Sequence, residues 1–112
     1  MPSENKDTEQ TIAHLQLIEQ SVQNLQSQKQ QFQMQIVEIE SALKEIEPAK
    51  EAYKIVGNIM VLSDKSELKK DLESKKSILD LRIKSIDKQE NQLREKSQKI
   101  RSKVMEDMDS KD

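Results

Sequence analysis

The sequence predicts an all-α dominated fold: an antiparallel two-helix coiled-coil hairpin with one short β-hairpin at the helix–helix connection. Three observations predict it. Apolar residues recur in heptads through both halves of the chain, a proline interrupts the helical pattern near the middle, and the apolar stretch YKIVGNIMVL follows that proline. The composition suits long, solvent-exposed helices better than a compact globule, because only 33% of the 112 residues are hydrophobic and 36% are charged.

The first half carries a continuous heptad pattern, which predicts a coiled-coil helix over residues 9–47. Ten seam positions alternate at spacings of three and four residues, and only Lys29 among them is polar: Leu15, Ile18, Val22, Leu25, Lys29, Phe32, Ile36, Ile39, Leu43 and Ile46. Pro48 ends the helix, because proline disfavours helical geometry in the residue before it. Residues 1–8 are expected to form a flexible N-terminus.

A second coiled-coil helix is predicted over residues 65–108, followed by a flexible acidic tail over 109–112. Asp64 suits the N-cap position, and Glu67 three residues later can complete a capping box. One seam row is fully apolar and recurs every seven residues: Leu72, Leu79, Ile86, Leu93 and Ile100. The other row is mixed: Lys69, Lys76, Ile83, Glu90, Ser97 and Val104.

The net charge of −2 conceals a segregation of charge along the chain. Residues 1–51 carry −5, residues 65–103 carry +6 and residues 104–112 carry −3. Arms of opposite sign favour packing against each other over pairing with themselves. The basic arm also raises nucleic-acid binding as a rival hypothesis. Its lysines are spread around the helix and it has no aromatic stacking groups, so no nucleic-acid partner is expected.

The insert over residues 48–64 predicts a β-hairpin. Gly57 followed by Asn58 suits a two-residue type II′ turn, because glycine tolerates a positive φ. That turn pairs Val56 with Ile59, Ile55 with Met60, Lys54 with Val61 and Tyr53 with Leu62. Both faces are then apolar apart from Lys54, and a lone two-stranded ribbon of this kind would aggregate. The insert is therefore predicted to be an oligomerisation element, through Tyr53, Ile55, Val56, Gly57, Ile59, Met60, Val61 and Leu62.

The stretch YKIVGNIMV between two coiled-coil helices resembles the β class of the prefoldin family, and the similarity covers about residues 10–108. The segments QSQKQQFQMQIVEIESALKEI and LDLRIKSIDKQENQL resemble the family's two arms. The β class has one hairpin and the α class two, and this chain has room for one. An archaeal-type subunit fits best, and a eukaryotic β-class paralogue stays open.

The resemblance implies a molecular co-chaperone that works without ATP. In the family, two α-class and four β-class subunits assemble through their hairpins into a hexamer. The ends of the coiled coils hold unfolded proteins and deliver them to a group II chaperonin. The rival hypothesis for this chain is a structural coiled-coil adaptor that binds one specific folded partner.

Both ends of the chain are expected to lie at the end of the coiled coil far from the hairpin, with more apolar side chains than a two-helix seam buries. The candidate client-binding residues are Ile12, Leu15, Leu17, Ile18, Ile100, Val104, Met105 and Met108. Methionine adapts to irregular apolar partners, which suits a promiscuous surface. The alternative is an ordinary seam with scattered surface residues.

The resemblance also implies that these ends dock on a basic surface of the chaperonin. The nearby acidic residues Glu106, Asp107 and Asp109 are candidates for this contact, since opposite charge steers association. A merely solubilising tail is an equal alternative.

No sequence feature indicates an enzyme. The chain has no cysteine and one histidine, His14, so a transition-metal site is not expected, and a single glycine cannot build a phosphate-binding loop. We therefore expect no cofactor. No apolar run approaches the ~18 residues of a membrane span, and no signal peptide is visible, so we expect a cytoplasmic protein without a membrane partner.

Overall fold

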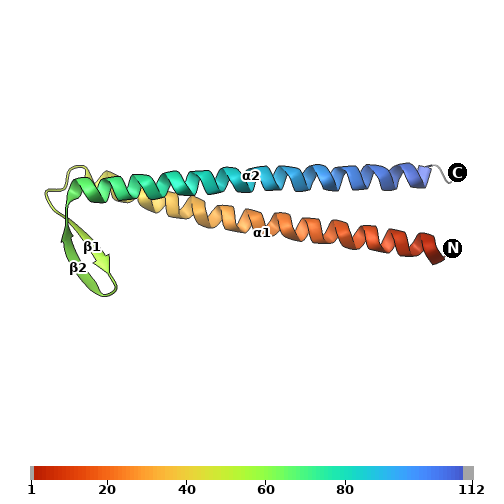
Figure 1. Cartoon of the computed structure of the whole chain (residues 1–112), viewed down its shortest axis with the longest axis horizontal. Coiled ribbons are helices and arrows are strands. Elements are labelled where there is room, and N and C mark those ends of the chain that lie inside the picture. Colours follow the sequence, from red (N-terminus) through yellow and green to blue (C-terminus); the bar gives the residue numbers. More distant parts are fainter. Residues whose placement is uncertain (1, 110–112) are drawn as a thin grey trace. The chain divides into compact units, whose positions relative to one another are not determined.

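The computed structural model describes residues 2–109, with side chains described for residues 7–107. It contains, in order, helix α1 (Pro2–Ile46), strands β1 (Ala52–Val56) and β2 (Ile59–Ser63), and helix α2 (Lys65–Asp109) (Figure 1). Two long helices with a two-stranded antiparallel sheet between them confirm the predicted fold class. The chain forms two compact units: a central unit, residues 29–84, and a terminal unit made of residues up to Gln28 and from Ser85 onward.

The heptad pattern of α1 predicts its buried face correctly. All ten seam positions are buried or half-buried, and Ile18 and Val22 are the most buried, at 5% and 3% exposure. The helix begins at Pro2 rather than near residue 9, so the segment expected to be flexible is helical from Pro2. Proline is tolerated in the first helical turn, because its missing N–H would have no partner there.

The mixed row of α2 is as much part of the seam as the apolar row. Every position of both rows is buried or half-buried, including Lys69, Lys76 and Glu90. Long lysine stems cover apolar neighbours while their ammonium groups stay in water. At the start of the helix, the carboxylate Oδ1 of Asp64 accepts the Ser66 N–H at 2.9 Å, which confirms Asp64 as the N-cap.

Polar pairs lie between the two arms within each unit and show that their register is antiparallel. In the central unit, Lys69 Nζ lies 3.2 Å from a Glu47 carboxylate oxygen, and Lys76 Nζ lies 3.1 Å from a Glu40 carboxylate oxygen. From the first pair to the second, the lysine lies one heptad later in the chain and the glutamate lies one heptad earlier. In the terminal unit, Gln26 Nε2 donates to Glu90 Oε1 at 3.2 Å. The acidic arm therefore lies against the basic arm in the central unit, as charge segregation predicts.

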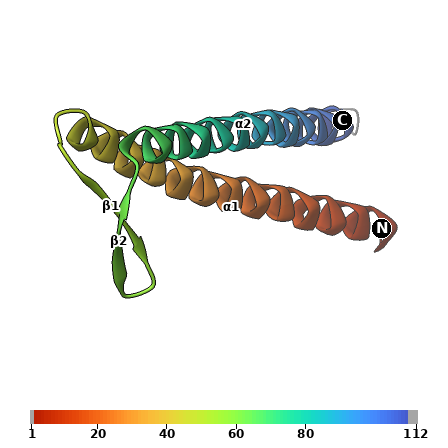
Figure 2. The same cartoon turned by 60° about the vertical axis from the view of Figure 1, so that its left-hand side comes forward.

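The β-hairpin has the predicted register, from Val56 opposite Ile59 to Tyr53 opposite Leu62, and extends to Ala52 opposite Ser63. Gly57 has a φ of 60°, and it is the one described residue with a positive φ. A positive φ at the first turn residue alone is the type II′ signature. We call Ala52–Ser63 the ribbon. It projects away from the helix ends of the central unit (Figures 1 and 2).

The seam makes a direct prediction about stability. Leu79 in the seam is 6% exposed, whereas Leu81 on the same helix is 66% exposed. Leu79→Ala should destabilise the helix pair by about 2–5 kcal/mol, because it removes buried methyl groups and leaves a cavity. Leu81→Ala should change stability by less than about 0.5 kcal/mol. Urea unfolding followed by circular dichroism measures both; equal losses in the two variants would contradict the seam.

Candidate functional site

The ribbon presents a large apolar surface on both of its faces. Alternation along the strands puts Tyr53, Ile55, Met60 and Leu62 on one face and Val56, Ile59 and Val61 on the other. Their side chains are between 47% and 71% exposed, and Lys54 is the one charged residue in either strand. All the residues predicted for oligomerisation are thus gathered on one exposed element.

Few polar interactions involve the ribbon itself. The Tyr53 hydroxyl donates to the Glu51 carboxylate at 2.8 Å. This hydrogen bond raises the pKa of Tyr53, with a smaller contribution from desolvation. At the start of the ribbon, Ala52 is buried, at 7% exposure, whereas residues 53–62 are exposed.

A second candidate site is an open groove of about 730 Å³ in the terminal unit. Both helices line it, and its lining mixes apolar, hydroxyl and charged side chains: Ile18, Glu19, Val22, Arg94, Ser97, Gln98, Arg101, Ser102, Met105 and Glu106. Ser97 is a seam position with a small side chain, opposite the buried Ile18 and Val22. A small residue where a large apolar one would fill the seam leaves space between the helices.

Of the two arginines in the groove lining, Arg94 is held by Glu90 and Arg101 is exposed. Arg94 donates to Glu90 Oε1 from Nη2 at 2.7 Å and from Nε at 3.0 Å. Arg101 is exposed and lies two helical turns further along α2 on the same groove. With Glu19 and Glu106 also in the lining, the groove offers charges of both signs around an apolar floor.

The predicted client-binding residues divide into three sets. Ile18 and Met105 line the groove, and Met105 is 64% exposed. Ile12 and Leu17 are exposed but do not line it, while Leu15, Ile100 and Val104 are half-buried at the seam. The side chain of Met108 lies outside the described residues. The structure thus brings two of the predicted residues together in one hollow.

The predicted acidic residues are also divided. Glu106 and Asp107 are exposed on the last turns of α2, and Glu106 belongs to the groove lining. The side chain of Asp109 lies outside the part that the structure describes. Glu106 therefore sits where the two predicted surfaces, for clients and for chaperonin, meet.

Sequence reasoning did not identify Val22, Arg94, Ser97 and Arg101 as site residues. The heptad pattern places Val22 and Ser97 in the seam, and the two arginines contribute to the positive charge of residues 65–103. The available signal was Ser97, a small polar residue in a row of larger side chains. A heptad pattern locates the seam, but the hollow depends on which side chains face each other across it.

Among the described residues, no three His, Cys, Asp or Glu side chains form a group suited to a metal ion. Over the same part of the chain, neither helix has a stretch long and apolar enough to cross a membrane.

Comparison with known proteins places these features in a family. The sequence profile described as prefoldin subunit matches residues 9–111. The prefoldin subunit beta of Methanothrix thermoacetophila is 32% identical over 100 residues, covering 87% of this chain and 83% of the relative. That of Sulfurisphaera tokodaii is 35% identical over 98 residues, covering 85% and 78%.

A solved structure agrees in fold. The crystal structure of the prefoldin beta subunit from Thermococcus strain KS-1 superposes with a TM-score of 0.82 at 27% identity, covering 89% of this chain and 90% of that chain. The beta2 subunit from the same strain, at 18% identity and a TM-score of 0.69, shares the fold. With its single ribbon between two long helices, and with relatives that match it over most of their length, the chain belongs to the prefoldin family of chaperone subunits, in its β class.

Proposed function

We propose that this chain is a subunit of a hetero-hexameric, cytoplasmic co-chaperone that captures unfolded proteins and transfers them to a group II chaperonin. Its ribbon joins four such β-class copies to two α-class subunits. The ends of its helices, in the terminal unit, hold the client. The work is done by binding alone, with no reaction and no cofactor. The observation that carries this proposal is a ribbon exposed on both faces, with seven large apolar side chains at 47% exposure or more.

Energetics favour assembly through the ribbon. Fully burying an apolar side chain of this size contributes about 1.5–3 kcal/mol, so seven of them contribute on the order of 10 kcal/mol when both faces are covered. Association costs about 4–15 kcal/mol in lost freedom of motion. If only one face were covered, the free energy gained by burial would be too small to offset most of the cost of association. A closed arrangement of several ribbons, which covers both faces and leaves few free edges, is therefore favoured over a simple pair.

The groove supports capture of unfolded chains. An unfolded protein offers apolar side chains interspersed with polar groups, without a fixed shape. The groove has an apolar floor of Ile18 and Val22, the flexible Met105 at its side, and charges of both signs around it. One groove binds weakly, but several joined on a common base bind one client through avidity. Exposed Ile12 and Leu17 add apolar surface in the same unit.

Transfer to a chaperonin requires a second, separable contact. Glu106 and Asp107 are exposed carboxylates near the end of the described part of α2. They would guide the complex toward a basic surface through charge, so that docking weakens as salt rises. Asp109 is proposed for the same contact on its position in the sequence.

The ribbon is tested by a matched pair of substitutions. Met60 on the ribbon and Leu81 on α2 are both 66% exposed. Met60→Asp should abolish assembly with the α-class subunit, because assembly would bury an unpaired carboxylate at a cost of several kcal/mol. Leu81→Asp should leave assembly intact. Light scattering gives the mass of each mixture, and a Met60→Asp chain that still enters the full complex would refute the role of the ribbon.

The groove is tested by a second matched pair. Met105 in the groove and Met34 on α1 of the central unit are 64% and 61% exposed. In the assembled complex, Met105→Ser should weaken client capture by about 1 kcal/mol for each copy, through lost apolar contact, and Met34→Ser should not. The measurement is suppression of aggregation for several unrelated denatured proteins. Equal effects of the two substitutions would argue against the groove, and protection of a single protein only would favour the adaptor hypothesis.

Filling the groove should raise the stability of the helix pair and lower client capture. Ser97→Leu adds apolar volume to the seam opposite Ile18 and Val22, and should stabilise the helix pair by roughly 1 kcal/mol. It should also reduce client capture, because the hollow is occupied. Ser97→Ala is the control, since it removes the hydroxyl without filling the space. Urea unfolding and the aggregation assay measure the two effects, and Ser97→Leu complexes that capture clients as well as the wild type would exclude the hollow as the binding site.

A further inference from the structure

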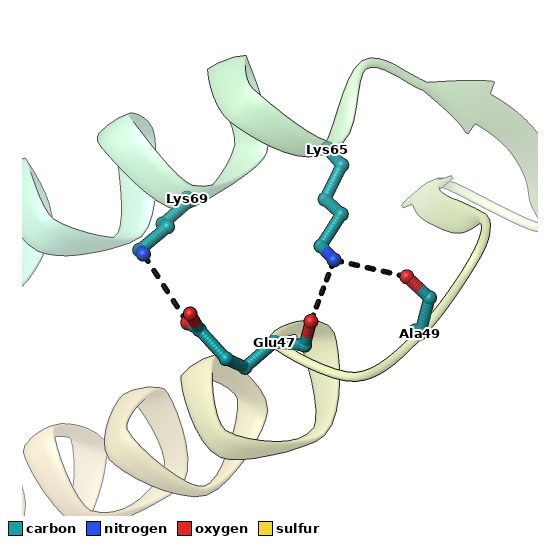
Figure 3. A network of polar contacts seen from close by, with 4 residues as sticks. All are labelled: Glu47, Ala49, Lys65 and Lys69. Carbon is teal, nitrogen blue, oxygen red and sulfur yellow. Dashed lines mark hydrogen bonds and ion pairs between the residues drawn. The ribbon is translucent and has the colours of Figure 1, made fainter.

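One lysine joins the two helix ends at the base of the ribbon. Lys65, the first residue of α2, directs its ammonium group back to the end of α1 (Figure 3). Its Nζ donates to the backbone carbonyl of Glu47 at 2.6 Å and to that of Ala49 at 3.0 Å. The side chain is half-buried. These two contacts link segments that the whole ribbon separates in sequence.

The carbonyl groups that Lys65 binds lie just beyond the C-terminal end of α1. The last carbonyls of a helix have no partner within the helix and carry its negative dipole end. α1 ends at Ile46, so the carbonyl of Glu47 lies directly after it, and that of Ala49 lies in the segment leading to β1. A cation with several donors satisfies both at once, and does so better than a neutral group would.

The neighbouring Lys69 contact joins two exposed side chains, whereas Lys65 binds backbone carbonyls. Lys69 forms an ion pair with the Glu47 carboxylate at 3.2 Å, but the two side chains are 42% and 69% exposed (Figure 3). Exposed pairs of long side chains constrain geometry weakly. On the other strand, the Asp64 cap fixes where α2 begins, directly after Ser63 ends β2. Lys65 thus ties the segment that leaves α1, before β1, to the first residue of α2.

We propose that Lys65 is a positioning residue for assembly: its clamp on the Glu47 and Ala49 carbonyls sets the direction in which the ribbon leaves the helices. This inference rests on the proposed role of the ribbon in assembly. A two-stranded ribbon that meets several others must arrive at a defined angle, and a base held in one geometry lowers the ordering cost of association. A base without the clamp would present the same apolar surface over a range of directions.

The test compares three substitutions in the full-length chain mixed with its α-class subunit. Lys65→Met keeps the apolar stem and removes every donor, whereas Lys65→Arg keeps both charge and donors. Lys69→Met removes only the exposed ion pair. The assembly constant is measured by titration with light scattering, and the helical content and thermal midpoint of the unmixed chain by circular dichroism.

We expect Lys65→Met to weaken assembly at least tenfold with helical content unchanged. Lys65→Arg should assemble nearly as well as the wild type, and Lys69→Met should have little effect. Assembly of Lys65→Met at the wild-type level would overturn the inference. So would a loss equal to that of Lys69→Met, or one that Lys65→Arg shares. If Lys65→Met does not fold, Lys65→Leu, which also removes every donor, replaces it under the same criteria.

The failure of this inference can be told from the failure of the proposed function. Met60→Asp is measured in the same titration. If it abolishes assembly while Lys65→Met does not, the ribbon still joins the subunits and the clamp has no positioning role. If neither substitution affects assembly, the ribbon itself is not the joining element and both proposals fall.

Discussion

The structure depends on one constraint: the chain gathers seven exposed apolar side chains on an element that cannot bury them by itself. A two-stranded ribbon has no second layer, and the ribbon here carries apolar residues on both faces. Within the central unit, the helix ends do not cover it, since it projects away from them (Figure 2). Water alone is a poor environment for such an element, and we therefore propose that other chains cover its surface.

The helices solve a different problem with few apolar residues. A heptad seam uses about two side chains in seven, which leaves the remaining surface free for charge. In the mixed row of α2, even charged residues occupy seam positions: Lys76 pairs with Glu40 of α1, and Lys69 pairs with Glu47, directly after α1. Where the seam has Ser97 instead of a large side chain, a groove opens in the terminal unit. The same sparse seam that holds the helices together therefore also opens the groove that we propose as the client site.

Periodic features of this molecule could be predicted from sequence, and local three-dimensional ones could not. The seam, the ribbon register and the Asp64 cap follow from residue spacing and turn chemistry, and all three are present. The groove at Ser97 and the Lys65 clamp depend on which residues face each other across two helices, which spacing along one helix does not specify. The heptad pattern does not predict that α1 starts at Pro2, because the first residues contain no apolar seam position. A polar segment can be helical without one.

The central claim is that the exposed ribbon makes this chain one member of a larger complex. The most direct measurement is the mass, by native mass spectrometry, of the complex formed when the purified chain is mixed with the α-class subunit from the same cell. The account predicts a single species with four copies of this chain and two of the α-class subunit. A chain that stays monomeric in that mixture, at concentrations where both proteins are folded, would contradict it.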